Sequence, residues 1–261
     1  MFRLLRTLRR RLLHQQKVKK YLLYAIGEIL LVVVGILIAL GINNWNEDQK
    51  DRKEEQKALQ LLQIEFTTNL EQLESKIRLR NHIINQSMQI IGWMDQGAEV
   101  QIDTLLQKMS AIMIAPTFDP VFNTNLHEEK INLIKNDSLR AHLNNWNSQM
   151  ADFSERENEW VNLTNSYTIP LLIRLGISRN INLSFYENPE NLSYLFENSN
   201  RKRINLPKSK YLLTSKDLLN NTELEGVVSN AILMNEGINW ESEAVKLYVK
   251  TILNLIEQEI K

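Results

Sequence analysis

The sequence predicts an all-α protein in which an N-terminal transmembrane helix precedes an extracytoplasmic helical bundle with long, coiled-coil-like helices. Three observations support this fold class. Residues 21–42 form an apolar run with a single charged residue, Glu28. Beyond this run, apolar residues recur in steps of three or four over three long segments, which is the period of an α-helix. No segment has a convincing alternating pattern of a β-strand.

The apolar run at 21–42 has the length of a transmembrane helix. Its 22 residues, at about 1.5 Å rise each, match a hydrocarbon core of roughly 30 Å. Tyr21, Tyr24 and Trp45 lie at its two ends, where aromatic rings favour the headgroup level. We therefore predict that these three residues are membrane-interface anchors.

The composition excludes several classes of protein. The 261 residues contain no cysteine, so disulfides, thiolate metal sites and cysteine nucleophiles are excluded. Three of the eight glycines lie within the apolar run, which leaves too few for the phosphate-binding turns of nucleotide-binding α/β folds. Five tryptophans and a mean hydropathy of −0.30 exclude a wholly disordered chain.

Charge is distributed unevenly along the chain. Residues 1–42 hold eight basic residues and one acid, whereas residues 43–261 hold 23 basic and 30 acidic residues, a net charge of −7. The positive-inside rule predicts a basic cytoplasmic segment at 1–20 and a helical domain outside the cytoplasm at 43–261. The acidic domain argues against nucleic acid as a partner. The predicted inner-leaflet basic cluster consists of Arg3, Arg6, Arg9, Arg10, Arg11, Lys17, Lys19 and Lys20.

Two features of the N-terminus have alternative interpretations. A cleaved signal peptide is the alternative to a membrane anchor, because Ala39 and Gly41 provide small residues at a cleavage spacing. The long basic region and the long apolar run favour the anchor. Residues 1–13 place leucines on one helical face and arginines on the other, which suits an amphipathic helix on an anionic inner leaflet. The arginines could equally serve only to set the orientation.

The residues around the apolar run resemble a known family. Residues 20–47 read KYLLYAIGEILLVVVGILIALGINNWNE, which is similar to the opening signature of domain of unknown function 6090. INLIKNDSLR at 131–140 and the C-terminal helix resemble that family more loosely. The resemblance implies an uncharacterised bacterial single-pass membrane protein with a mostly helical extracytoplasmic region, and it implies no activity, cofactor or catalytic residue. The predicted location is therefore the bacterial inner membrane, with the N-terminus in the cytoplasm and the C-terminal domain in the periplasm.

The first long helix of the outer domain is predicted to continue the transmembrane helix without a break. Its apolar pattern has a gap near Arg80 and ends at Gly92 and Gly97. Shorter helices are predicted at 104–113 and 123–135.

A second long helix is predicted to begin at Asn136, which offers N-cap chemistry, and to end at Pro170. Glu157 breaks its apolar seam. Aromatic residues recur every seven residues along this helix. Such an aromatic stripe is more often part of a bundle core than the lining of a ligand cavity. The aromatic stripe consists of Trp146, Phe153, Trp160 and Tyr167.

A third long helix is predicted from about Glu223 to the C-terminus, with a heptad seam that Asn235 and Ser242 interrupt. Packing within the chain's own bundle is favoured over a homodimeric coiled coil. The seam consists of Val228, Ala231, Ile238, Val245, Val249, Ile252 and Ile256.

Residues 174–214 lack helical periodicity and are predicted to be irregular, with one short helix beginning at Asn188. Basic residues cluster in this segment. They could hold an anionic partner, although a solvated loop is the simpler interpretation. The cluster consists of Arg201, Lys202, Arg203, Lys208 and Lys210.

The sequence contains no complete catalytic motif. His127 begins HEEKI, but the zinc-protease pattern requires a second histidine where Ile131 stands. We therefore predict that the protein is not an enzyme and has no catalytic, cofactor-binding or metal site.

Glu28 is the residue that composition does not explain, because it lies about 10 Å inside the apolar run. It shares one helical face with Val32, Gly35 and Ala39, and the small pair Gly35 and Ala39 allows close approach of a second helix. The alternative is that Glu28 is protonated or reaches the inner headgroups, with no function.

We expect one of two functions. The first is a non-enzymatic, membrane-anchored protein-interaction, scaffold or sensor module in the periplasm. The second is an accessory subunit of an ion-coupled membrane complex that uses Glu28. The predicted partners are the lipid bilayer and a membrane or periplasmic protein, or a second copy of the chain.

Overall fold

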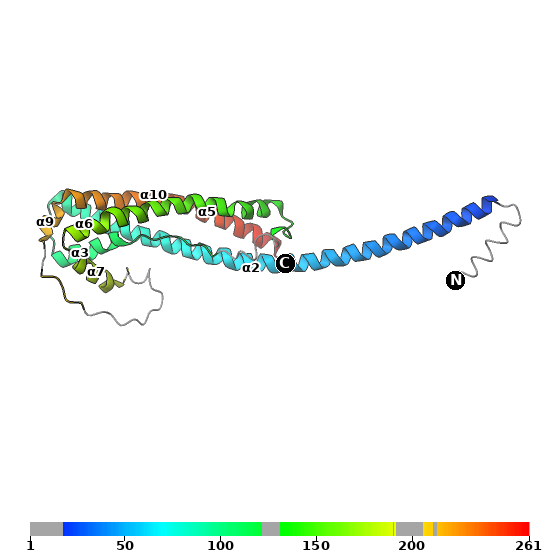
Figure 1. Cartoon of the computed structure of the whole chain (residues 1–261), viewed down its shortest axis with the longest axis horizontal. Helices are drawn as coiled ribbons and strands as arrows, with labels where there is room; N and C mark the ends of the chain where they lie inside the picture. The colour runs from blue at the N-terminus through cyan, green and yellow to red at the C-terminus, as the bar shows by residue number, and fades with distance from the viewer. Residues whose placement is uncertain (1–17, 122–130, 190, 192–205, 211–212, 261) are drawn as a thin grey trace. The chain divides into compact units, whose positions relative to one another are not determined.

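The computed structural model describes residues 18–121, 131–189, 191, 206–210 and 213–260, and within these ranges it contains helices and no strands. The predicted all-α class is therefore confirmed. The elements are α2 (Val18–Gln96), α3 (Ile102–Met109), the 3₁₀ turn η1 (Ser110–Met113), α5 (Asp137–Leu163), the π-helical turn η2 (Thr164–Thr168), α6 (Ile169–Arg174), α7 (Ser178–Glu187), α9 (Ser215–Leu219) and α10 (Thr222–Glu259), as Figure 1 shows.

The first long helix, α2, has 79 residues and runs without a break from the apolar run into the outer domain. This continuity was predicted. Gly97 follows the last helical residue with φ +58°, a left-handed conformation that glycine adopts without the steric cost of a Cβ. Gly92 was also predicted to end the pattern, but it lies inside the helix.

The chain divides into two compact units, Met1–Lys57 and Ala58–Lys261. The described part of the first unit is the N-terminal portion of α2. The second unit has its own hydrophobic core, to which the apolar seams of α2, α5 and α10 contribute. At its centre the Phe66 and Trp146 rings meet edge to face, with 5.0 Å between centroids, which is a favourable aromatic geometry.

The two long helices α5 and α10 each begin next to a side chain that can accept a hydrogen bond from the first turn. Asn136 Oδ1 accepts a hydrogen bond from the Leu139 backbone N–H (2.9 Å), which confirms the predicted N-cap of α5. Asn221 caps α10 in the same way, through the Leu224 N–H at 2.8 Å. The α5 and α10 helices then pack against each other (Figure 1).

The heptad seam of α10 is buried within the chain's own bundle, as favoured from the sequence. Val228, Ala231 and Ile238 are fully buried, and the two polar interruptions, Asn235 and Ser242, are buried with them. Val245 is half-buried at the edge of the seam.

The prediction that the aromatic stripe belongs to the bundle core is correct for three of its residues and wrong for the fourth. Trp146, Phe153 and Trp160 are buried, but Tyr167 is 64% exposed. The reason is the π-helical turn η2, which adds one residue to the turn and moves the next core position from Tyr167 to Thr168. The predicted end at Pro170 is also wrong, because Pro170 lies in the first turn of α6, where its missing N–H is tolerated.

The segment predicted to be irregular, 174–214, is more ordered than expected at its beginning. It contains α7, whose C-cap is Asn188, and the described residues Pro189 and Asn191 beyond it are helical, as predicted for a helix beginning at Asn188. Lys208 lies in the described part and forms an ion pair with Asp103 at 2.9 Å. Most of the predicted helix at 123–135, and the residues Arg201, Lys202 and Arg203, lie outside the described residues.

Candidate functional site

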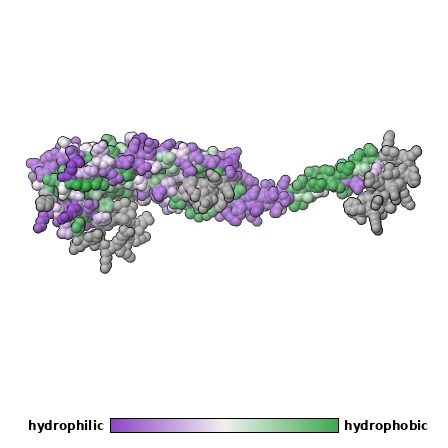
Figure 2. All heavy atoms as spheres, viewed as in Figure 1, coloured by the Kyte–Doolittle hydropathy of each residue, from purple (hydrophilic) through white to green (hydrophobic). Residues whose placement is uncertain are grey.

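The N-terminal part of α2 exposes a continuous apolar surface. Every residue from 26 to 42 is exposed, and Figure 2 shows this stretch as a green run. Among the described residues, α2 is the one helix that is long and apolar enough to cross a membrane, and none of its most apolar window is buried. A core helix of a soluble protein would be mostly covered, so this exposed surface is compatible with a membrane-spanning helix.

The predicted contact face lies within this surface. Glu28, Val32, Gly35 and Ala39 follow one another at steps of four, three and four on a continuous helix, so they share one side of α2. All four residues are exposed. A Cβ added to Gly35 would meet nothing within 4 Å, so the chain leaves room for a second helix here.

The predicted interface anchors lie at the two ends of the apolar surface. Tyr21 is half-buried, whereas Tyr24 and Trp45 are exposed. The 24 steps from Tyr21 to Trp45 span roughly 36 Å of helix at 1.5 Å per residue, within the thickness of a bilayer with its headgroups. Of the predicted basic cluster, Lys20 is exposed and Lys19 is helical, while the six residues from Arg3 to Lys17 lie outside the described residues.

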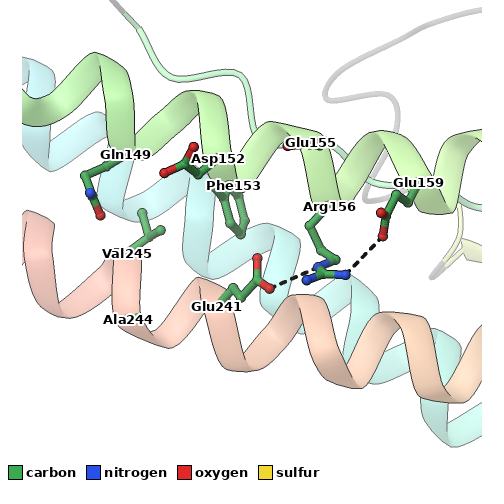
Figure 3. A pocket seen from close by; sticks show the side chains of 9 residues that line it. All are labelled: Gln149, Asp152, Phe153, Glu155, Arg156, Glu159, Glu241, Ala244 and Val245. Atoms are coloured by element: carbon green, nitrogen blue, oxygen red, sulfur yellow. Dashed lines mark hydrogen bonds and ion pairs between the residues drawn. The ribbon is translucent and has the colours of Figure 1, made fainter.

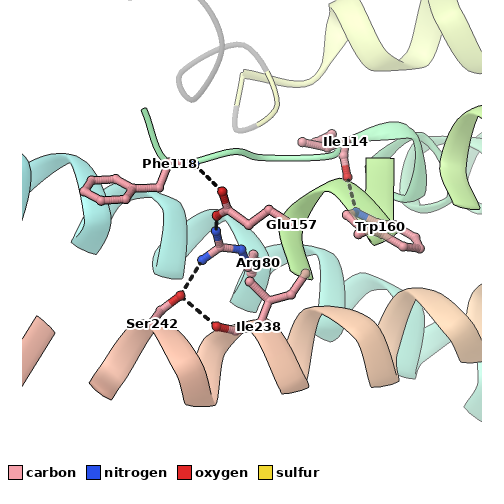
Figure 4. Close-up of polar contacts among 7 residues, drawn as sticks. All are labelled: Arg80, Ile114, Phe118, Glu157, Trp160, Ile238 and Ser242. Atoms are coloured by element: carbon pink, nitrogen blue, oxygen red, sulfur yellow. Dashed lines mark hydrogen bonds and ion pairs between the residues drawn. The ribbon is translucent and has the colours of Figure 1, made fainter. Parts of the chain in front are cut away.

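A buried polar network joins the three long helices of the second unit. Arg80 of α2 donates from Nη2 to Glu157 Oε1 of α5 and from Nη1 to Ser242 Oγ of α10 (2.9 Å), as Figure 4 shows. The other Glu157 oxygen, Oε2, accepts from the Phe118 backbone N–H (2.8 Å). Ser242 Oγ donates in turn to the Ile238 carbonyl (2.7 Å). Arg80 and Glu157 are 0% and 2% exposed at their side chains.

Burial dominates the electrostatics of this pair. It raises the pKa of Glu157 to about 7, and the charge of Arg80, the Phe118 N–H and the charge of Lys76 oppose the increase. Burial likewise lowers the pKa of the Arg80 guanidinium, and Glu157 opposes that change. The pair fixes the relative positions of α2 and α5, because either charge alone would be strongly disfavoured in this core.

Arg80, Glu157 and Ser242 had each been identified in the sequence as an interruption of an apolar seam, but their association had not been predicted. The gap near Arg80, the break at Glu157 and the polar residue at Ser242 each belong to a different helix. A search for interruptions of opposite charge in separate seams would have suggested that they pair.

A shallow groove of about 490 Å³ lies between α5 and α10 (Figure 3). Arg156 crosses it, with Nε donating to Glu241 at 3.0 Å and Nη1 donating to Glu159 at 3.1 Å. The hydrogen bond and the charge of Glu241, and then the charge of Glu159, raise the pKa of Arg156. The lining residues are Gln149, Asp152, Phe153, Glu155, Arg156, Glu159, Glu241, Ala244 and Val245.

The histidines in the described residues do not converge on a metal-type site. His82 Nε2 lies 3.2 Å from Asn191 Oδ1, and the His142 ring meets Tyr248 edge to face at 5.0 Å. Within the described ranges there is no group of three His, Asp or Glu residues that could hold a metal ion. His127 lies outside those ranges.

An exposed apolar helix followed by an all-α bundle with its own core defines a helical protein with one candidate membrane helix. The model of the Family of unknown function (DUF6090) matches residues 28–151, which supports the family resemblance found in the sequence. The match begins at Glu28 and ends within α5, so it includes Arg80 but not its partners Glu157 and Ser242. The curated proteins and the solved structures gave no match.

Proposed function

We propose that the protein is a non-enzymatic, single-pass protein of the bacterial inner membrane whose periplasmic helical bundle binds another protein, as a scaffold or sensor. The observation that carries the proposal is the exposed apolar surface of α2 at residues 26–42. The same unbroken helix continues into a unit that has a core of its own. An anchor attached to a folded helical module suits a protein that holds a binding surface close to a membrane.

The charge distribution supports the orientation of this anchor. The eight basic residues before and at the start of α2 favour a cytoplasmic N-terminus, and the net charge of −7 over residues 43–261 is compatible with a domain on the other side.

The buried chemistry supports a non-enzymatic function. Glu157 has the raised pKa that a general acid requires, but both of its oxygens accept hydrogen bonds and its side chain is 2% exposed. A substrate could reach this carboxyl only if the bundle opened. The group therefore supports the structure rather than a reaction.

Photo-crosslinking of the full chain in native membranes tests the proposal. The crosslinker is placed in turn at exposed positions around the bundle, and the products are identified by mass spectrometry. We expect a defined protein product from a contiguous set of positions. The absence of crosslinked products at every position, or products that contain only lipid, would contradict the proposed function.

A second candidate function is an accessory subunit of an ion-coupled membrane complex. It is favoured by Glu28, an exposed carboxyl within the apolar surface and on the same side as the small residues Gly35 and Ala39. Replacement of Glu28 separates the two candidates, because an anchor tolerates its loss and an ion-coupled subunit does not.

A further inference from the structure

The outward side of α10 carries an exposed apolar stripe. Leu233, Trp240 and Leu247 are 65%, 72% and 68% exposed, and they lie seven residues apart. On an α-helix this spacing places all three on one side, opposite the buried residues Ala231 and Ile238. The α10 helix is therefore buried along one apolar seam and exposes a second apolar seam on its opposite side.

Small residues lie between the three large ones. Gly237 and Ala244 complete the series 233, 237, 240, 244 and 247, whose alternating steps of four and three are those of a coiled-coil seam. A Cβ added to Gly237 would meet nothing within 4 Å, so the space beside Trp240 is open. We name these five residues the outer stripe.

Acidic side chains border the outer stripe on both sides. On the side away from α5 the exposed residues Glu236 and Glu243 follow the stripe, and Glu243 forms an ion pair with Lys246 at 3.6 Å. On the other side lies the groove between α5 and α10, where Arg156 pairs with Glu241 and Glu159, and Asp152 and Glu155 also line the groove (Figure 3). Ala244 belongs to both the groove and the stripe. A basic residue, Lys250, is exposed beyond Leu247 at the C-terminal end.

These charges select among the possible occupants of the stripe. Anionic lipid headgroups would be repelled by the acidic borders. A second copy of α10 would also be disfavoured, because a parallel pairing brings Glu236 towards Glu241 of the copy and an antiparallel pairing centred on Trp240 brings Glu236 towards Glu243. A helix with basic borders would instead meet opposite charges on both sides.

We infer that the outer stripe of α10 docks an amphipathic helix of another protein, one with an apolar coiled-coil seam bordered by lysine or arginine. This inference depends on the proposed function, which supplies the requirement for a protein partner. Trp240 is the central anchor, since a large aromatic residue at the centre of such a surface contributes most to binding. Glu236, Glu243 and the acidic groove select the charge of the partner.

A pair of designed peptides tests the inference on the full chain in detergent micelles. Both peptides have about three heptads with leucine along the seam; one has lysine and the other glutamate at the bordering positions. A third peptide has the composition of the first in scrambled order. We expect the lysine-bordered peptide to bind and shift the tryptophan emission to shorter wavelength, with binding that weakens as salt is added. Equal binding of the scrambled peptide, or preference for the glutamate-bordered one, would overturn the inference.

Variants of the stripe and of its borders provide the second arm. Trp240→Ala should weaken binding of the lysine-bordered peptide by about tenfold or more. The double replacement Glu236→Lys with Glu243→Lys should reverse the preference between the two peptides. Tyr167→Ala is the matched control, because Tyr167 is an aromatic residue of similar exposure on a different helix. Equal loss in Tyr167→Ala and Trp240→Ala would contradict docking at the stripe.

The native partner distinguishes this inference from the proposed function. If crosslinks from the bundle to a protein persist in the Trp240→Ala variant, the docking surface is wrong and the proposed function stands. If no position of the bundle gives a protein product, the proposed function itself fails. A concentration-dependent dimer that Trp240→Ala abolishes, measured by sedimentation, would show that a second copy occupies the stripe and would overturn the proposed partner.

Discussion

Arg80 and Glu157, 77 positions apart, form a buried ion pair between α2 and α5 that Ser242 of α10 completes. A buried charge without its partner is strongly disfavoured, whereas replacing both charges by apolar groups is often tolerated. The pair therefore specifies how the helices of the bundle are matched, and its energetics can be measured by mutation.

We expect single replacements of the pair to be more damaging than the double replacement. Arg80→Met or Glu157→Leu should each lower the free energy of unfolding by about 3–5 kcal/mol, because the remaining charge has no partner in the core. The double variant should recover much of that loss. Urea denaturation of residues 50–261, which include the whole compact unit Ala58–Lys261, measures these values. Additive losses in the double variant would show that the two side chains act independently.

The raised pKa of Glu157 predicts a pH dependence of stability with a defined sign. The ordinary value is 4.5 and the folded value is about 7, so the folded state binds the proton more tightly than the unfolded chain. The contribution of this proton is complete below pH 4.5 and is lost as the pH rises through about 7. The parent protein should therefore lose stability relative to Glu157→Gln over this range, by about 1.4 kcal/mol for each pH unit between the two pKa values. Parallel stability curves for the two proteins would contradict the raised pKa.

The π-helical turn predicts a contrast between two aromatic residues of the same sequence stripe. Trp160 is buried and its Nε1–H donates to the Ile114 carbonyl (3.1 Å), so Trp160→Ala should cost about 3–5 kcal/mol. Tyr167 is exposed, so Tyr167→Ala should change stability by less than about 0.5 kcal/mol. Thermal denaturation of the two variants makes the comparison, and similar losses would show that the register shift is wrong.

The sequence predicted the features that depend on local chemistry. Gly97 ends α2 through its left-handed backbone, and Asn136 caps α5, since both effects act over a few neighbouring residues. The register of Tyr167 could not be predicted, because a regular helical period does not indicate a π-helical turn, which is a rare insertion into an α-helix. The association of Arg80 with Glu157 depends on which helices are neighbours. The outer stripe at Trp240 was missed because the buried seam of the same helix accounted for the heptad pattern.

The face of α2 that contains Glu28 predicts association in membranes. Glu28→Gln keeps a hydrogen-bonding group and should preserve contact with a second helix, whereas Glu28→Leu removes that group and Gly35→Ile blocks close approach. The last two variants should therefore weaken association, measured by energy transfer between labelled chains or by crosslinking to a partner. If both associate as the parent does, the helix is an anchor alone and the ion-coupled candidate loses its support.

The proposed function requires that α2 spans the membrane with its N-terminus in the cytoplasm and the helical bundle on the other side. Because the chain has no cysteine, single cysteines can be introduced as unique labels. Thr7→Cys lies in the basic segment, and Ser229→Cys lies near the start of α10. A membrane-impermeant maleimide applied to cells with a permeabilised outer membrane should label Ser229→Cys at once and Thr7→Cys only after lysis. Immediate labelling of Thr7→Cys with protection of Ser229→Cys would contradict the topology, and labelling of neither before lysis would place the bundle in the cytoplasm.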